Sequence, residues 1–429
     1  MREKNHSDCK NSEWLESLED PVRKKLPDNG LPDLDAVLKL FPRPVGQPAF
    51  DEELIKGNIA RLKTFPAVNT GHELLDLSVK TGLAMIDATF QGNHPKYGVK
   101  EYAENRHDGF PPTVISAVDA LSAWGMEQRA KEIFTYYLDV FVKDNGSIDY
   151  WGPSLSEYGQ LLNLANMVDK RIGAEGWLSS CFKPLNRMSE YLLGLIGVAE
   201  NEDVQLVKGV PEADEYSIVR KFFHNNVWVA RGLSAWGELC RRRGLKSKTP
   251  AKLILAKSKI LAGNTITAIE KTWRNSRVEW WLPPQVEPLA PDEVPGNKIT
   301  ETRFASYTNY RYWPELLSSG ILPRRLAGRV VEARLISGGQ FCGMTRFADW
   351  LDDWTLYDYL HGLWMLGRKK DFLFSLYGHV AYHQAEGHLT AYEQVTFPPG
   401  KEKAAYCLPC QLTAARAVRL FVKPEIADF

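Results

Sequence analysis

The chain has 429 residues, 44% hydrophobic and 25% charged, which is the balance of a globular protein with a large core. Lys+Arg and Asp+Glu are both 53, so the formal net charge is zero. This argues against a general nucleic-acid binder, whose affinity comes mainly from phosphate neutralisation. No apolar run is long enough to span a bilayer and no apolar signal segment follows Met1, so we expect a cytoplasmic protein without membrane contact.

Residues 1–70 contain two short helical patterns, about 12–25 and 51–63, joined by a Pro-rich passage. We expect this region to be an N-terminal wrap around one domain, residues 71–429. From residue 73 onward, apolar residues at i, i+3, i+4 and i+7 predict twelve helices, with strand patterns almost absent. Outside the unit described next, these helices fall near 73–90, 155–169, 176–198, 217–242, 249–273, 305–319, 323–336, 354–366, 369–385 and 405–421.

The most informative stretch runs from His107 to Gln160. Asp108 and the Pro111-Pro112 pair open a helix that Gly125 ends, and a second helix carries an apolar stripe between Ala130 and Phe141. The loop that follows is rich in acids and aromatics, namely Asp149, Tyr150, Trp151 and Glu157.

This unit recurs along the chain. Leu-Ser-Ala-Trp-Gly occurs at 121–125 and again at 233–237, each time predicted to close an apolar helix. A looser copy starts at Asp353 and ends in a loop that carries Glu393. Chance similarity among amphipathic helices is the alternative, but repeated pairs indicate stacked hairpins that share one core.

Six helical hairpins in succession favour an all-α architecture, the (α/α)6 toroid. An inner ring of six helices would be wrapped by an outer ring, and the loops at one end would form a funnel. The segment DGFPPT, which opens a helix, and GSIDYWGPSLSEYGQ, which follows the next one, resemble the six-hairpin glycosidase superfamily. Its members include glycoside hydrolases, unsaturated-uronide hydrolases, some polysaccharide lyases and sugar epimerases. The resemblance implies a carbohydrate site in the funnel without fixing the reaction.

Glycoside hydrolysis needs two carboxyl groups across the scissile bond. The catalytic candidates are Glu393, Asp149, Glu157 and Asp353. Glu393 lies in an apolar and aromatic loop where burial would suit a proton donor, and Asp149 or Glu157 would be the base or nucleophile.

Each acid also has a local structural explanation. Ser154 and Glu157 have the spacing of a capping box, and Asp149 is in a turn. Asp353 is expected to cap its helix, and Asp108 occupies the matching place in the central unit. Because caps at the mouth of an inner helix also point into the funnel, Asp108 is a candidate for substrate binding.

Sugar rings stack on aromatic side chains, while polar groups bind their hydroxyls. The candidates for substrate binding are His107, Asp108, Tyr150, Trp151, Tyr310, Arg311, Trp313, Arg346, Trp354, His388 and Tyr392. Arg311 or Arg346 would pair with a substrate carboxylate if the sugar is a uronic acid.

Two other functions stay open. A lyase or epimerase on the same fold would use His107, His388, Tyr150 or Tyr392 as its base. A toroid without catalysis would bind a glycan or a protein partner through its aromatics. The sugar, the linkage, the stereochemistry and the oligomeric state are not predictable from the sequence.

We expect no cofactor and no metal. The nine His show no HExxH motif, and His379 and His383, four residues apart on one helix, are expected to have no third ligand nearby. Cys407 and Cys410 are predicted to be ordinary cysteines at the start of a helix.

Overall fold

The computed structural model describes residues 24, 65, 68–173, 176–212, 218–384, 389–396 and 406–422. Nearly all of the predicted N-terminal wrap, with its two helices, therefore lies outside the described residues, and so does His388. In the described part of the chain, no helix is both long and apolar enough to cross a membrane.

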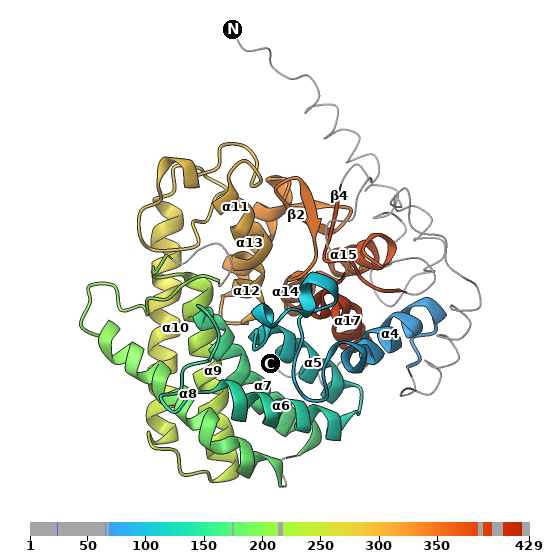
Figure 1. The fold of residues 1–429 in the computed structure, drawn as a ribbon. Coiled ribbons are helices and arrows are strands. Elements are labelled where there is room, and N and C mark those ends of the chain that lie inside the picture. The colour runs from blue at the N-terminus through green and yellow to red at the C-terminus, as the bar shows by residue number, and fades with distance from the viewer. Residues whose placement is uncertain are drawn as a thin grey trace.

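The helices form two concentric rings (Figure 1). The outer ring contains α4 (Glu73–Thr89), α6 (Glu127–Phe141), α8 (Trp177–Ala199), α10 (Ala251–Arg274), α13 (Arg324–Ile336) and α15 (Lys369–Tyr382). The inner ring contains α5 (Pro111–Ala123), α7 (Leu155–Ile172), α9 (Phe223–Arg243), the run α11 (Arg303–Tyr307), η4 (Thr308–Tyr312) and α12 (Trp313–Ser318), then α14 (Leu356–Leu366), and α16 (Leu408–Gln411) with α17 (Thr413–Val422).

Contacts between successive inner helices close the ring. The inner helices touch in the order α5, α7, α9, α12, α14 and α17, and α17 returns to α5. Figure 1 shows α17 beside α4, the first helix after the N-terminal region. The predicted (α/α)6 toroid is therefore confirmed.

A buried ion pair network joins the two ends of this ring. Asp119 of α5 accepts from Arg416 of α17 and from Arg171 of α7, each at 2.7 Å. Burial alone would raise the pKa of Asp119, but the two guanidinium groups lower it to about 2. The first and last inner helices are thus held by charge as well as by apolar packing.

Several helix ends follow the predicted signals. Gly125 and Gly367 have φ values of +81° and +70° just after α5 and α14, as left-handed C-terminal positions require. The second Leu-Ser-Ala-Trp-Gly segment, however, does not end its helix, because α9 continues to Arg243. A side chain at Gly237 would meet Leu255 at 2.9 Å, so this glycine serves the close packing of α9 on α10.

One small antiparallel sheet accompanies the helices of the described residues, in line with the expectation that strands are almost absent. Its strands are β1 (Gln340–Phe341), β2 (Met344–Phe347), β3 (Trp350–Asp352) and β4 (Gln394–Thr396), in that order. Strands of two to four residues are too short for their alternation to be seen in the sequence. The register pairs Asp352 with Gln394, which brings the segment before α14 against the segment after α15.

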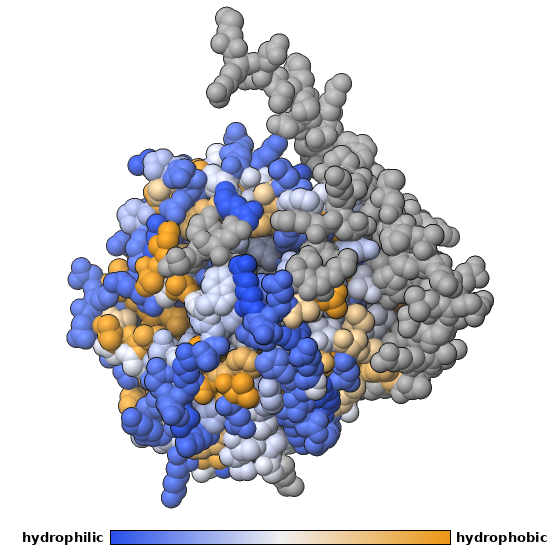
Figure 2. Space-filling view, in the orientation of Figure 1, coloured by the Kyte–Doolittle hydropathy of each residue, from blue (hydrophilic) through white to orange (hydrophobic). Residues whose placement is uncertain are grey.

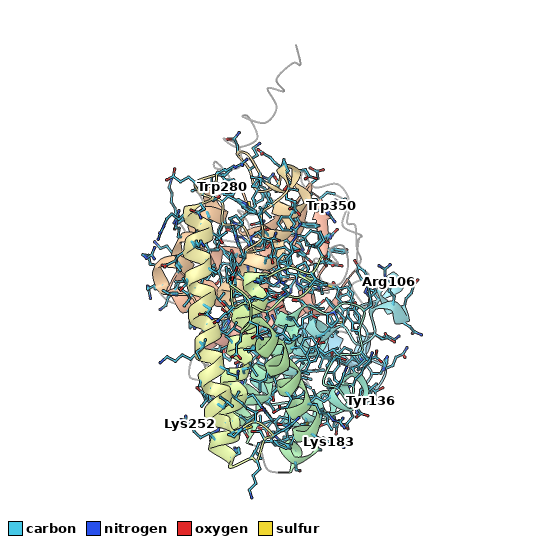
Figure 3. The ribbon with its side chains drawn as sticks, turned by 90° about the vertical axis from the view of Figure 1, so that its left-hand side faces the viewer. Arg106, Tyr136, Lys183, Lys252, Trp280 and Trp350 are labelled. Carbon is cyan, nitrogen blue, oxygen red and sulfur yellow. The ribbon has the colours of Figure 1, made fainter. Side chains whose placement is uncertain are left out.

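Figure 3 shows Trp280 and Trp350 at the end of the molecule opposite Lys183 and Lys252. Lys183 lies in the second turn of outer helix α8 and Lys252 in the first turn of outer helix α10, whereas Trp280 follows α10 and Trp350 precedes inner helix α14. Segments that lead from outer to inner helices therefore gather at one end. The face in Figure 2 is mainly hydrophilic with small apolar areas, as on ordinary protein surfaces.

Candidate active site

Two buried carboxyl groups come together where β3 and β4 pair. Asp352 ends β3, and Glu393 directly precedes β4. The Asp353 N–H donates to the carbonyl of Glu393 at 3.4 Å, which holds the two segments side by side. Asp352 is fully buried, and Glu393 is 6% exposed.

The environment of Asp352 favours its protonated form. Its Oδ1 accepts from the Trp354 N–H at 3.1 Å, and its Oδ2 accepts from Gln394 Nε2 at 2.5 Å. Burial, followed by the negative charge of Glu393, raises the pKa of Asp352 well above its usual range despite these bonds. A carboxyl that keeps its proton in this way is suited to act as a general acid.

Two tyrosines surround the carboxyl of Glu393. Tyr97 Oη donates to Glu393 Oε1 at 2.9 Å, and the Tyr102 ring lies 4.8 Å from the Tyr97 ring. Burial raises the pKa of both tyrosines, and the charge of Glu393 contributes to each shift. Both phenols therefore remain hydrogen-bond donors over the physiological pH range.

Aromatic rings form a wall beside these carboxyls. Trp354 stacks on Phe110 with centroids 5.5 Å apart, and Tyr310 lies 5.9 Å from Trp354. Tyr150 continues the wall at 5.4 Å from Phe110, and the 43% exposed Trp151 forms its outer edge. Trp354 and Phe110 are buried within this wall, and Trp151 is exposed, as an aromatic ring must be for the C–H face of a sugar to stack on it.

His107 and Asp108 have different surroundings although they are adjacent. The half-buried His107 ring packs 5.3 Å from Tyr97 and 5.7 Å from Tyr102, so it belongs to the aromatic group. Asp108 is bound by Lys96 and His94, each at 2.8 Å. It does not cap α5, whose N-cap Phe110 has no side-chain cap bond.

Glu157 and Arg311 form a buried ion triad with Glu315. Arg311 donates to Glu157 at 2.6 Å and to Glu315 at 2.7 Å, and all three side chains are at most 3% exposed. Ser154 caps α7 through the Ser156 N–H, while the Glu157 side chain binds Arg311, so the observed bonds do not form the predicted capping box. The triad links α7 to the run η4–α12 inside the ring.

The Asp353 carboxylate is also held inside the fold by contacts with other residues of the protein. It is fully buried, its Oδ1 accepts from the Thr345 N–H at 2.9 Å, and its Oδ2 lies 3.0 Å from His379 Nδ1. The expectation that Asp353 caps α14 is wrong, because that helix starts at Leu356 with Thr355 as its N-cap.

The remaining candidates lie apart from the carboxyl pair or at its border. The Asp149 side chain is 61% exposed and pairs with Lys143 at 2.7 Å. Trp313 is fully buried, donates to the Leu282 carbonyl and packs on Trp281, so it belongs to the core. Arg346 on β2 and Tyr392, the residue before Glu393, are half-buried.

Asp149→Asn is therefore expected to change little. We expect kcat within about twofold of the parent and a change in unfolding free energy below about 0.5 kcal/mol, because an exposed ion pair contributes little. Parallel activity assays and urea unfolding measure both quantities. A large loss of activity with intact folding would instead assign Asp149 to catalysis.

No family model matches the chain, and no curated protein matches it. Solved structures do match over most of its length. A glycosidase that is 13% identical aligns with a TM-score of 0.56 over 87% of this chain and 99% of that chain. The chain has the fold of the six-hairpin glycosidases.

Two further structures agree. A bacterial glucoamylase complexed with acarbose gives a TM-score of 0.55 at 12% identity, over 88% of this chain and 60% of that chain. An unsaturated glucuronyl hydrolase specific for heparin gives a TM-score of 0.51 at 10% identity, over 82% of this chain and 97% of that chain. Such low identities establish the fold, and the chemistry of this chain has to be argued from its own site.

Sequence reasoning missed four members of the site: Asp352, Tyr97, Tyr102 and Phe110. Asp352 stands in the acidic run next to the chosen Asp353, and only the position of β3 decides which of the two lies beside Glu393. Phe110 could have been found from the sequence. It directly precedes the Pro-Pro pair that opens an inner helix, and the segment before an inner helix lies at the funnel.

Proposed function

We propose that the protein is a glycoside hydrolase in which Asp352 and Glu393 are the catalytic carboxyl pair. The supporting observation is that these two carboxyls are buried side by side at the end of the toroid where the inner helices begin, with an aromatic wall beside them. Two carboxyls of unequal proton affinity are what glycoside hydrolysis requires.

The hydrogen bonds suggest a division of roles. Asp352 has the raised pKa and would protonate the glycosidic oxygen as the bond to the anomeric carbon breaks. Glu393 accepts from Tyr97 and is suited to carry negative charge, so it would activate water or attack the anomeric carbon. This reverses the role that the sequence suggested for Glu393, while Asp352 replaces Asp149 and Glu157 in the pair.

The wall explains how a sugar would be positioned. The exposed Trp151 and the half-buried Tyr150 would provide the outer stacking faces, Trp354, Phe110 and Tyr310 would support them from inside, and His107 would donate to a hydroxyl. Arg311 already binds two carboxylates of the protein, which argues against a role as partner of a uronate. Arg346 remains the candidate for that role.

The test is turnover of a panel of aryl glycosides and oligosaccharides by the parent, Asp352→Asn, Glu393→Gln and the control Asp149→Asn. We expect hydrolysis of at least one member by the parent and by the control, and a loss of hydrolysis in both site variants. Full activity in either site variant would contradict the assignment. A lyase would instead yield an unsaturated uronide that absorbs in the ultraviolet.

The dependence of kcat on pH should report the protonation state of Asp352. The titratable groups around it are Glu393, Asp353, Tyr102, Tyr310 and Cys410. Because activity needs protonated Asp352, kcat should persist above the ordinary range of an aspartic acid and fall as pH rises through its raised pKa. In Glu393→Gln, which lacks the neighbouring charge, this fall in the residual activity should move to lower pH. An unmoved profile would contradict the coupling.

A further inference from the structure

A second buried cluster lies next to Asp353 and Tyr392. His379 and His383 are one turn apart on α15 and its C-cap, and Cys410 is on α16. All three are fully buried, and their potential metal ligand atoms lie within 4.8 Å of one another. The expectation that the two histidines have no third ligand nearby is therefore wrong.

Hydrogen bonds fix the tautomers of both histidines. His379 Nδ1 lies 3.0 Å from Asp353 Oδ2, and His383 Nδ1 lies 3.0 Å from the Tyr392 carbonyl. The Asp353 carboxylate and the Tyr392 carbonyl can act only as acceptors here, so in each neutral imidazole the proton sits on Nδ1 and Nε2 bears the lone pair. Metal-binding histidines commonly have this arrangement, with a carboxylate or carbonyl behind the ring.

The two Nε2 atoms are in an unfavourable state without a cation. Within the described part of the chain neither has a hydrogen-bond partner. His383 Nε2 even lies 3.3 Å from Asp353 Oδ2 without the geometry of a hydrogen bond. A cation shared by the nitrogens would satisfy both lone pairs.

Cys410 supplies the third ligand. Its thiol donates to the Tyr392 carbonyl at 3.0 Å, so the sulfur carries its proton when no metal is bound. Metal binding would replace the S–H bond by a metal–sulfur bond and release one proton to solvent. Ligand atoms of a tetrahedral zinc site are roughly 3.3–3.7 Å apart, so ligand atoms that now lie up to 4.8 Å apart would draw together by up to about 1.5 Å.

We propose that His379, His383 and Cys410 bind a divalent transition metal of the zinc class. Two imidazoles and one thiolate are a zinc-type ligand set, and the closed surroundings suit a structural ion. The ion would tie α15 to α16 and, through Asp353 and the Tyr392 carbonyl, brace the chain on both sides of Asp352 and Glu393. The proposal does not depend on the glycosidase assignment.

The test is metal binding by the full chain, stripped with a chelator and loaded with Zn²⁺ or Co²⁺. We expect about one equivalent of Zn²⁺ by elemental mass spectrometry, and for Co²⁺ a thiolate charge-transfer band in the near ultraviolet. Cys410→Ser should abolish the band, and His379→Gln should lower the bound metal several-fold. Cys240→Ser, a matched change of another buried cysteine, should keep both.

The wild-type spectrum decides the matter even if a variant fails to fold. A folded parent that binds neither ion after loading, or that binds Co²⁺ without the thiolate band, would overturn the proposal. Retention of stoichiometric metal in both Cys410→Ser and His379→Gln would overturn it as well, because the ion would then lie elsewhere.

Discussion

Glu393→Gln should lower kcat by about 10³-fold while the protein stays folded. The substitution keeps the shape of the side chain and its acceptor oxygen for Tyr97, but it removes the charge that would activate water or attack the sugar. Removing such a group typically costs about 10²–10⁴-fold in rate. KM should change by less than kcat, since the aromatic wall is left intact.

Asp352→Asn is the companion measurement for this pair. It should lose activity to a similar degree, yet thermal unfolding should show equal or higher stability at neutral and alkaline pH. The sign follows from the raised pKa: ionising a buried Asp costs folding free energy as pH rises above the unfolded value, and asparagine removes that cost. Asp349→Asn, an exposed acid three residues earlier, is the matched control and should change neither quantity. Lower stability of Asp352→Asn at alkaline pH would contradict the direction of the shift.

Arg311→Met should destabilise the fold by about 3–5 kcal/mol. The change leaves the carboxylates of Glu157 and Glu315 buried without their shared cation, which is more costly than the loss of the ion pairs alone. Urea unfolding of the parent and the variant gives the difference. The triple variant with Glu157→Gln and Glu315→Gln should regain most of the loss, because no uncompensated charge remains.

Arg325→Met is the control for this experiment. Arg325 pairs with Glu270 at 2.6 Å, but its side chain is 70% exposed, so its removal should cost less than about 0.5 kcal/mol. A loss below about 1 kcal/mol in Arg311→Met would show that the triad is hydrated or rearranged, and would reopen Arg311 as a ligand for substrate.

The ring of helices could be predicted because its signals are local. The stripe on α6, the Pro pair at the start of α5 and the glycines after α5 and α14 are each visible within a dozen residues. Six such hairpins in a row leave few ways to bury their apolar faces. The small sheet was not predictable in this way, since its strands pair residues far apart and are shorter than the alternation needed to recognise them.

The site was predicted only in part. Acids near aromatic residues in the sequence indicate the loops of a funnel, but they do not show which side chains contact one another. Glu393, Trp354 and Tyr310 were found from their neighbours in sequence. The contacts of Tyr97 with Glu393, of Glu157 with Arg311, and of Cys410 near His379 join residues that only the closed ring brings together. Asp352 and Asp353 show most clearly what the sequence could not predict. A shift of one residue along an extended chain reverses the direction of a side chain, so the sequence did not show which of the two lies beside Glu393.

The most direct measurement is a crystal structure of Glu393→Gln with an uncleaved substrate identified in the panel. The scissile oxygen is predicted within hydrogen-bond reach of Asp352, with residue 393 beside the anomeric carbon and the sugar stacked on the Trp354 wall. A sugar bound at another part of the surface, with Asp352 and residue 393 out of reach of the glycosidic bond, would contradict the assignment.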